Sequence, residues 1–206
     1  IKIIAMVISS CKIAALNAGL GKDEINKLLE IAKQAAERGG ASLMNNFGRI
    51  KTIKCKGTSG DLVTNADIEC EKIIIDYLEK ETPNISILAE ESGYKLKDGE
   101  LKWCIDPLDG TTNYAHGYPF FATSIGLIWN SNPILGAISV PFLNEIYYAS
   151  PELGAFCNGE KINVSDTNSL SDSLLVTGFA YDRREVLDNN YSEFCWLTHR
   201  THGVRR

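Results

Sequence analysis

The sequence lacks the features that mark several special classes of protein. Its 21 basic and 26 acidic residues leave a formal net charge of −5, and no block of basic residues is present. This balance argues against binding to nucleic acid. No apolar run approaches the roughly 18 residues that span a bilayer, so no membrane segment is predicted. The remaining composition, 44% hydrophobic over 206 residues, excludes disorder and fibrous folds and indicates one folded domain or two small ones.

Closely spaced cysteines are also missing. The six cysteines lie at positions 11, 55, 70, 104, 157 and 195, so no C-x-x-C motif for zinc or redox chemistry occurs. A chain of this length buries enough core to fold without disulfides. We therefore predict that the cysteines are small buried side chains in a reducing compartment, and that the protein is cytoplasmic.

Several common catalytic fingerprints are absent. The sequence contains no G-x-G-x-x-G, no G-x-x-x-x-G-K-[ST] and no G-x-S-x-G. The usual nucleotide-binding loops and the serine-hydrolase elbow are thereby disfavoured. His199 and His202 have a spacing that could suit a metal, but Arg200 and Arg205 beside them favour a solvated basic stretch.

The first part of the chain is helical in pattern. Residues 1–20 contain a short apolar stretch and are interpreted as a leader of doubtful status. Apolar residues at three- and four-residue spacing then predict a helix over 23–47, with Asp23 as its N-cap, and a second helix over 66–80. The Gly39-Gly40 pair costs the first helix stability, so close packing against a neighbour is expected there.

Beyond Pro83 the pattern changes to strands. Short apolar runs predict strands at 86–89, 103–105, 123–129, 134–140, 146–149 and 174–179, with turns at Asn132-Pro133 and Asn158-Gly159. Helices followed by many strands favour a layered α/β or α+β fold. We divide it into a first half over 21–150 and the start of a second half over 151–206.

Acidic residues follow two of the predicted strands. Glu90 and Glu91 come after the first of these strands and Asp106 and Asp109 after the second, while Asp67 lies at the start of the second helix. Strand ends are where ligands collect in open α/β sheets. Carboxylates that converge there repel unless a cation neutralises them, and oxygen-only ligands select Mg²⁺ or Mn²⁺ over zinc. Solvated loop acids are the alternative.

The segment D-P-L-D-G-T-T-N, which begins at Asp106, adds a second ingredient. Pro107 stiffens the backbone, so that two carboxylates three residues apart can converge with the Leu108 carbonyl between them. Gly110 allows close backbone approach, and the next residues resemble a helix start whose N–H groups bind phosphate. Metals beside a phosphate cradle would make a phosphoryl-transfer site. A turn that only redirects the chain is the competing interpretation.

These motifs resemble those of the inositol monophosphatase family. W-C-I-D-P-L-D-G-T-T-N-Y from Trp103, with the H-G and Pro119 that follow, is similar to the family's first signature. K-G at Lys56, D-L-V-T and Asp67 are similar to the segment before it. L-A-E-E-S-G, which contains Glu90 and Glu91, resembles the acidic pair, with Ala89 where glycine is common. The resemblance extends from about residue 28 to the end.

The resemblance implies an αβαβα sandwich, a homodimer and Mg²⁺-dependent hydrolysis of a phosphate monoester. By motif position, one Mg²⁺ would be held by Glu90, Asp106 and the Leu108 carbonyl, and a second by Asp106 and Asp109. Water orientation is implied for Thr111 with Asp67, and base action for Glu90. Substrate or phosphate binding is implied for Asp109, Gly110 and Thr111, the last two through their N–H groups, and phosphate attraction or orientation for Lys56 and Glu91.

The expected substrate is a small phosphorylated polyol, with myo-inositol monophosphate first. Histidinol phosphate, fructose 1,6-bisphosphate and adenosine 3′,5′-bisphosphate are alternatives, as is a non-catalytic remnant that binds metal and phosphate. The family's second signature, W-D-x-x-[AG]-G, does not occur in these residues. We expect the coding sequence to continue past Arg206 into that motif.

Overall fold

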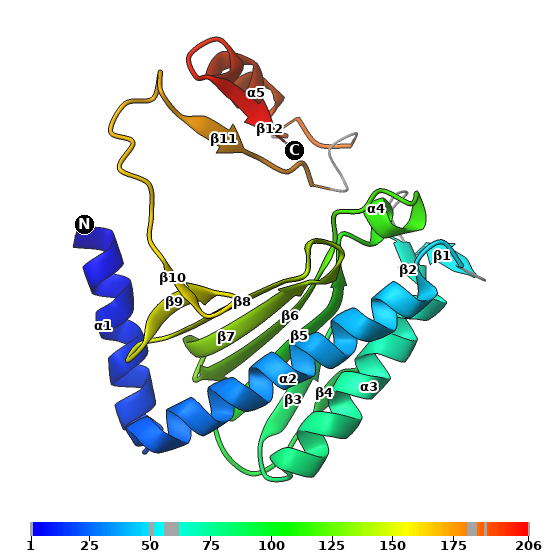
Figure 1. The fold of residues 1–206 in the computed structure, drawn as a ribbon, viewed down its shortest axis with the longest axis vertical. Coiled ribbons are helices and arrows are strands. Elements are labelled where there is room, and N and C mark those ends of the chain that lie inside the picture. Colours follow the sequence, from blue (N-terminus) through cyan, green and yellow to red (C-terminus); the bar gives the residue numbers. More distant parts are fainter. Residues whose placement is uncertain (1, 50–51, 56–61, 181–184, 188, 206) are drawn as a thin grey trace. The chain divides into compact units, whose positions relative to one another are not determined.

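The computed structural model describes residues 2–49, 52–55, 62–180, 185–187 and 189–205 (Figure 1). The chain forms two compact units, which are described separately. The larger contains residues 1–54 and 63–162, and the smaller contains residues 55–62 and 163–206.

An eight-stranded mixed sheet forms the centre of the larger unit. Its order is β10-β9-β8-β7-β6-β5-β3-β4, and every neighbouring pair is antiparallel except β3 and β5, which are parallel. The strands are β3 (Ser86–Ala89), β4 (Gly93–Lys95), β5 (Leu101–Asp109), β6 (Ala122–Trp129), β7 (Asn132–Val140), β8 (Glu145–Ser150), β9 (Gly154–Cys157) and β10 (Glu160–Ile162). A 3₁₀ turn, η1 (Pro141–Leu143), precedes β8. The α/β class predicted from the sequence is confirmed.

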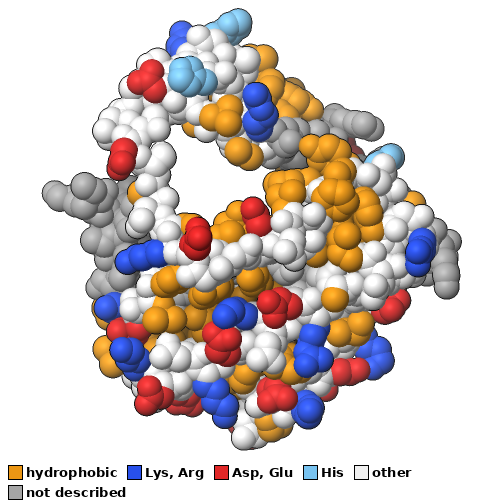
Figure 2. Space-filling model, viewed as in Figure 1, with side chains coloured by type: hydrophobic (Ala, Val, Ile, Leu, Met, Phe, Trp, Pro, Cys, Tyr) orange, Lys and Arg blue, Asp and Glu red, His pale blue; other side chains and the backbone are white. Residues whose placement is uncertain are grey.

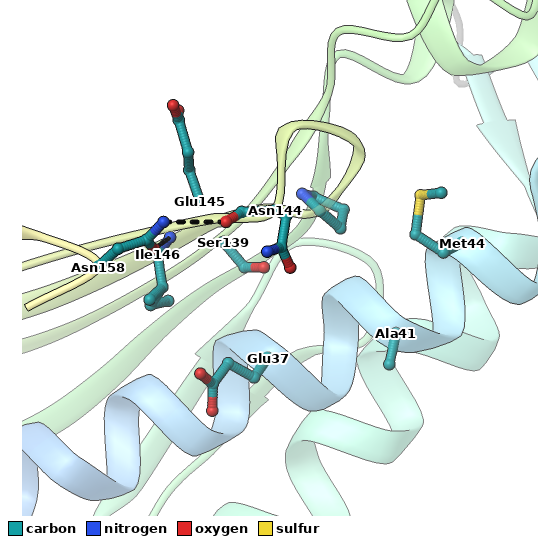
Figure 3. Close-up of a pocket in the computed structure, with 9 residues that line it drawn as sticks. Glu37, Ala41, Met44, Ser139, Asn144, Glu145, Ile146 and Asn158 are labelled. Carbon is teal, nitrogen blue, oxygen red and sulfur yellow. Dashed lines mark hydrogen bonds between the residues drawn. The ribbon is translucent and has the colours of Figure 1, made fainter.

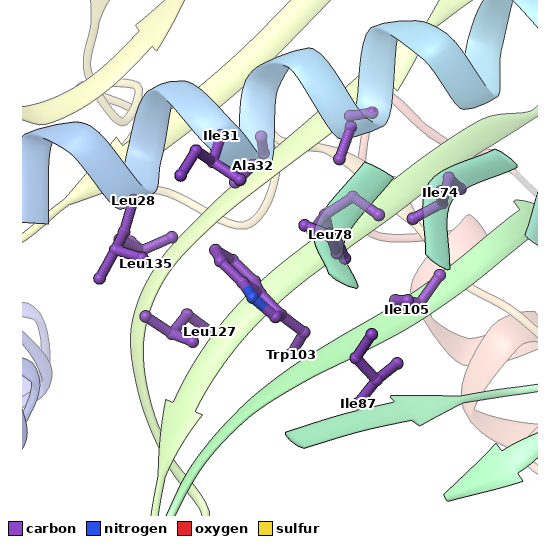
Figure 4. Close-up of a cluster of buried hydrophobic side chains, with 14 of the residues drawn as sticks. Leu28, Ile31, Ala32, Ile74, Leu78, Ile87, Trp103, Ile105, Leu127 and Leu135 are labelled. Carbon is purple, nitrogen blue, oxygen red and sulfur yellow. The ribbon is translucent and has the colours of Figure 1, made fainter. Parts of the chain in front are cut away.

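Helices cover one face of this sheet. Figure 1 shows α2 (Lys22–Asn46) and α3 (Asn65–Glu81) running across it. α2 packs on β6, β7 and β8, and α3 packs on β5. Strand alternation explains the fit, because every second residue of β6 is buried on the helical side. The buried Trp103 of β5 lies among Leu28, Leu78 and Leu127 in Figure 4.

The two helices begin differently. The N-cap of α2 is Gly21, so the prediction of Asp23 as N-cap is wrong. Asp23 lies in the first turn, where a carboxylate interacts favourably with the positive end of the helix dipole. α3 begins at a capping box, in which Thr64 and Asp67 exchange side-chain and backbone hydrogen bonds.

Close packing accounts for the two adjacent glycines of α2, as predicted. A Cβ on Gly39 would lie 2.8 Å from both Ile74 Cδ1 and Thr123 Cγ2. A Cβ on Gly40 would lie 2.6 Å from Ser139 Oγ. The helix therefore approaches α3 and the sheet at a distance that no larger residue allows without movement.

Gly39→Ala tests this packing. Alanine is favoured over glycine inside a helix by about 1 kcal/mol, so without a clash the variant would be more stable. We expect it instead to be destabilised by about 1–2 kcal/mol, because methyl groups of Ile74 and Thr123 must shift. Denaturant unfolding measures the change, with Ala41→Gly on the exposed side of α2 as the control for helix propensity. A gain in stability would contradict the packing account.

One predicted turn is displaced and the other is confirmed. The turn between β6 and β7 is Asn130-Ser131, whose φ values are 45° and 64°, whereas Asn132 and Pro133 already belong to β7. Two successive positive φ values suit a tight hairpin turn. The Asn158-Gly159 turn joins β9 and β10, with φ values of 50° and 88°.

The remaining elements are short except for the first helix. α1 (Lys2–Asn17) packs on β7 and buries Ala14 and Ala15. β1 (Ile53–Cys55) pairs with β2 (Leu62–Thr64). In the smaller unit, β11 (Leu174–Val176) pairs in parallel with β12 (Gly203–Arg205), and α5 (Tyr191–Thr198) lies between them in sequence. The strand predicted over 174–179 thus ends three residues early.

Surface charge is mixed on the face drawn in Figure 2, where acidic and basic side chains are interspersed over the larger unit. This distribution is typical of a solvated surface. None of the helices in the described residues has both the length and the apolar character needed to cross a membrane.

Candidate metal and phosphate site

A β-bulge in β5 places two acidic residues on the same face of the sheet. Asp106 pairs with Ser124 and Asp109 pairs with Ala122, so three steps along β5 match two steps along β6. In a regular strand, residues three apart face opposite sides. The extra residue in the bulge removes this conflict, and both carboxylates share the face of Ser124 and Ala122. The strand predicted to end before Asp106 therefore continues through the bulge.

Glu90 reaches this face from the neighbouring strand. β3 is parallel to β5 with Ala89 opposite Ile105, and the Glu90 N–H donates to the Ile105 carbonyl at 3.2 Å. The next residue pair along the register is Glu90 and Asp106, whose carboxyl groups share a hydrogen bond. Burial, followed by repulsion from Glu90 and Asp109, raises the pKa of Asp106 to about 7. Full ionisation of this group is therefore costly unless a cation compensates.

The candidate metal ligands at this position are carboxylate oxygen atoms. A hollow of about 310 Å³ opens beside the pair and is lined by Leu88, Ala89, Glu90, Cys104, Ile105, Asp106, Ser124 and Gly126. Across the described parts of the chain, no three histidine, cysteine or acidic side chains converge as a group that could hold a metal ion. The two adjacent carboxyl groups fit a hard cation such as Mg²⁺ better than zinc.

Asp67 and Thr111 meet on the α3 side of the bulge. Asp67 is buried, and its Oδ2 accepts hydrogen bonds from the Thr64 N–H at 2.8 Å and from Thr64 Oγ1 at 2.6 Å. Its Oδ1 lies 3.3 Å from Thr111 Oγ1, which also lies 3.0 Å from the Leu108 carbonyl oxygen. Burial raises the pKa of Asp67, and the bonds from Thr64 oppose that shift. The single Thr111 proton serves only one of its two acceptors at a time.

Gly110 lies between the acidic strand and a short helix, α4 (Thr111–Ala115). Its φ of 89° is in the left-handed region, and a Cβ there would lie 3.1 Å from the Phe120 carbonyl oxygen. Glycine is therefore required at this turn. Tyr114 is fully buried and donates from its hydroxyl to the Leu43 carbonyl at 2.7 Å, which anchors α4 to α2.

Of the predicted site residues Lys56 and Glu91, the structure describes only Glu91. It also shows a further acidic residue, Glu71, in contact with the site. Lys56 lies outside the described residues. The Glu91 N–H donates to Oε2 of Glu71 at 2.7 Å. Sequence reasoning missed Glu71, which is 3% exposed on α3. The available signal was its position one turn after Asp67, where an acidic residue interrupts the buried face formed by Cys70 and Ile74.

A separate pocket lies between α2 and the β7–β8 region (Figure 3) and has a volume of about 470 Å³. Two asparagines at its rim bond within the protein. Asn158 Nδ2 donates to the Asn144 carbonyl at 3.0 Å, and Asn158 Oδ1 accepts from the Ile146 N–H at 2.8 Å. These amides hold the loops around β8. The two carboxyl groups that line the pocket, Glu37 and Glu145, lie on opposite sides of it in Figure 3.

Comparisons with known proteins agree with the motifs. The profile of the inositol monophosphatase family matches residues 24–206. "Inositol-1-monophosphatase" of Synechocystis sp. is 50% identical over 89% of this chain and 64% of its own length. "Fructose-1,6-bisphosphatase/inositol-1-monophosphatase" of Aquifex aeolicus is 40% identical over 80% of this chain and 63% of its length.

A solved structure gives the same result for the fold. The inositol monophosphatase from Anabaena (Nostoc) sp. superposes with a TM-score of 0.76 and is 48% identical, over 88% of this chain and 66% of that one. This chain thus spans less than two thirds of the length of each of these three proteins. The family profile, the high identity to both relatives and the shared fold together show that the chain belongs to the inositol monophosphatase family.

Proposed function

We propose that the protein is a Mg²⁺-dependent phosphatase of small polyol phosphates, with myo-inositol monophosphate as its first candidate substrate. The observation that carries the proposal is the contact between the carboxyl groups of Glu90 and Asp106. The β5 bulge supports it, because it puts Asp109 on the same face of the sheet as Asp106. The Asp67–Thr111 contact next to this acidic group supports a hydrolytic role. The names of the two relatives support the reaction and the substrate class.

Glu90, Asp106 and the Leu108 carbonyl would hold one Mg²⁺, and Asp106 and Asp109 a second. Bound Mg²⁺ supplies a Lewis acid that lowers the pKa of water and neutralises charge on the leaving oxygen. The raised pKa of Asp106 supports this assignment, since the carboxyl pair is stabilised in its ionised form by a cation.

The chain's own groups position the water and the phosphate. When Thr111 donates its proton to Asp67, its oxygen lone pairs are left to accept a hydrogen bond from the attacking water. Glu90 accepts a proton from that water as the general base. The N–H groups of Gly110 and Thr111, at the start of α4, hold phosphate oxygens. Lys56 attracts the phosphate, and Glu91 helps to orient the turn between β3 and β4 that carries Glu90.

Thr111→Val tests the role of the hydroxyl. The variant keeps the shape of the side chain but removes the proton donor to Asp67, so kcat should fall by at least about 100-fold. Thr111→Ser keeps the hydroxyl and should retain most of the activity. Steady-state phosphate release measures both, and equal rates for the valine and serine variants would exclude the hydroxyl from the reaction.

We extend the proposal to a homodimeric, cytoplasmic enzyme. The family resemblance supports the dimer. Of the five cysteines within the described residues only Cys70 is buried and Cys195 is exposed, so the prediction that the cysteines are buried is wrong for most of them. None of the five forms a disulfide, which supports a reducing compartment. Light scattering of the purified protein measures its oligomeric state.

The proposed reaction is tested by inorganic phosphate release with and without Mg²⁺, using the complete gene product that contains these residues. The panel holds inositol 1-phosphate, histidinol phosphate, fructose 1,6-bisphosphate and adenosine 3′,5′-bisphosphate. We expect Mg²⁺-dependent release, fastest from inositol 1-phosphate. A folded protein that binds Mg²⁺ and releases phosphate from none of them would instead be a non-catalytic binding protein.

A further inference from the structure

Glu71 is hydrogen-bonded to the turn between β3 and β4, which carries Glu90 and Glu91. Its side chain is buried on α3, yet both carboxylate oxygens have a partner on the turn between β3 and β4. Oε2 accepts from the Glu91 N–H at 2.7 Å, and Oε1 accepts from the Ser92 N–H at 2.9 Å. An ionised carboxylate only accepts hydrogen bonds, so two successive backbone donors match its chemistry.

These bonds fix the backbone on the far side of Glu90. On the near side, the Glu90 N–H is bonded to the Ile105 carbonyl of β5. On the far side, the next two N–H groups are both bonded to Glu71. Glu90 is therefore held between two anchors, one on the strand that bears Asp106 and one on α3. These bonds fix the position of the backbone from which the Glu90 side chain extends.

Asp67 and Glu71, both on α3, contact two different parts of the candidate site. They are four residues apart on α3 and therefore lie on the same side of it. Asp67 contacts Thr111, on the phosphate side of the site, and Glu71 contacts the turn of Glu90, on the metal side. One turn of α3 thus supports both halves of the candidate site.

We propose that Glu71 is a positioning residue, whose carboxylate sets the Glu90–Ser92 turn so that Glu90 presents its carboxyl group beside Asp106 for Mg²⁺. The inference rests on the proposed function, because it takes Glu90 as a metal ligand. Residues that orient metal ligands typically change metal affinity by about 10- to 100-fold when they are replaced.

Glu71→Gln is the most informative variant. Glutamine has nearly the same shape, but its amide keeps one acceptor oxygen and turns an NH₂ donor toward the other N–H group. We expect the Mg²⁺ Kd, measured by isothermal titration calorimetry, to rise by about 10- to 100-fold. At saturating Mg²⁺ the kcat should recover most of its wild-type value, because the ligand itself is still present. Glu90→Gln should lose kcat even at saturating Mg²⁺.

Glu69→Gln is the matched control. It removes the same charge from the same helix two residues away, at an exposed side chain bonded to Asn46 rather than to the turn. Its Mg²⁺ Kd should stay at the wild-type value. A folded Glu71→Gln protein whose Kd equals that of Glu69→Gln would overturn the proposal.

A second measurement needs no variant. Hydrogen exchange of the wild-type protein should show slow exchange at the amides of Glu91 and Ser92, although Ser92 is exposed. Exchange at the rate of an open turn would overturn the proposal even if Glu71→Gln does not fold. The two claims remain separable, since a wild-type protein without phosphatase activity would end the proposed function while its Mg²⁺ affinity still reported on Glu71.

Discussion

Asp106→Asn is expected to abolish Mg²⁺-dependent phosphate release. Asp106 is the acid assigned to both Mg²⁺ ions, and it lies in hydrogen-bond contact with Glu90. Metal ions supply several kcal/mol of transition-state stabilisation in such sites, and a loss of about 4 kcal/mol corresponds to a rate about 1,000-fold lower. Asp109→Asn, which affects one assigned ion, should also inactivate the enzyme while leaving the fold intact. Single-turnover phosphate release at high Mg²⁺ measures both losses.

Asp106→Asn should lower activity but should stabilise the folded state of the metal-free protein near neutral pH. The pKa of Asp106 is raised from 3.8 to about 7 in the folded state, so the folded protein retains this proton at pH values where the unfolded chain has released it. The contribution of Asp106 to the stability of the metal-free protein should therefore fall as pH rises between those two values, so the stability of the wild type relative to Asp106→Asn should fall over the same range. Thermal unfolding across this pH range checks the sign.

Mg²⁺ should stabilise the wild type against unfolding and should leave Asp106→Asn unaffected, because only the folded wild type binds the ion. Asp98→Asn, at an exposed loop position, is the control and should behave as the wild type in both assays. An Asp106→Asn protein that retains full activity at the same Mg²⁺ concentration would contradict the metal assignment.

Trp103→Ala is expected to have the largest effect on stability. Trp103 is 0% exposed, lies at the centre of the contact between α2, α3 and the sheet, and donates from Nε1 to Thr82 Oγ1 at 2.9 Å. Removal of a buried tryptophan ring typically costs about 3–5 kcal/mol, which is a large share of the 5–15 kcal/mol that hold a typical domain together. The variant should be poorly folded at 37 °C (a temperature about 10–30 °C below typical unfolding midpoints).

Two further variants separate packing from hydrogen bonding. Trp103→Phe keeps most of the ring volume and loses the Nε1 bond, so it should cost clearly less than Trp103→Ala. Leu96→Ala, at a side chain that is 70% exposed, should change stability by less than about 0.5 kcal/mol. Urea unfolding of the three variants gives the order. A Trp103→Ala protein as stable as Leu96→Ala would contradict the central place of Trp103 in the core.

Periodicity and turn chemistry were sufficient to predict α2, α3 and five of the eight strands in the sheet of the larger unit, whereas β4, β9 and β10 were not predicted. β3 has the predicted bounds, and α3 differs by one residue at each end, because Pro83 and the capping box limit it locally. Where prediction failed, geometry that the sequence does not encode locally was responsible. The turn at Asn130-Ser131 follows from strand twist and register, although the neighbouring N-P dipeptide gave the stronger signal.

The acidic residues of the candidate site were predicted from the sequence. The β5 bulge and Glu71, which position those residues, were not predicted. The D-P-L-D-G-T segment indicated a convergence of carboxylates, but a bulge against β6, which depends on pairing with a distant strand, is what lets residues three apart share a face. Glu71 was missed for a similar reason. Its partners are backbone N–H groups 20 and 21 residues away, and such partners leave no pattern of side-chain types in the sequence.

The metal site is tested most directly by anomalous diffraction from crystals of the complete gene product grown with Mn²⁺, which accepts the same oxygen ligands as Mg²⁺. We predict an anomalous peak between the carboxyl groups of Glu90 and Asp106, and no such peak in crystals of Asp106→Asn. Wild-type crystals with no peak there, in which Glu90 and Asp106 remain bonded to each other, would contradict the account.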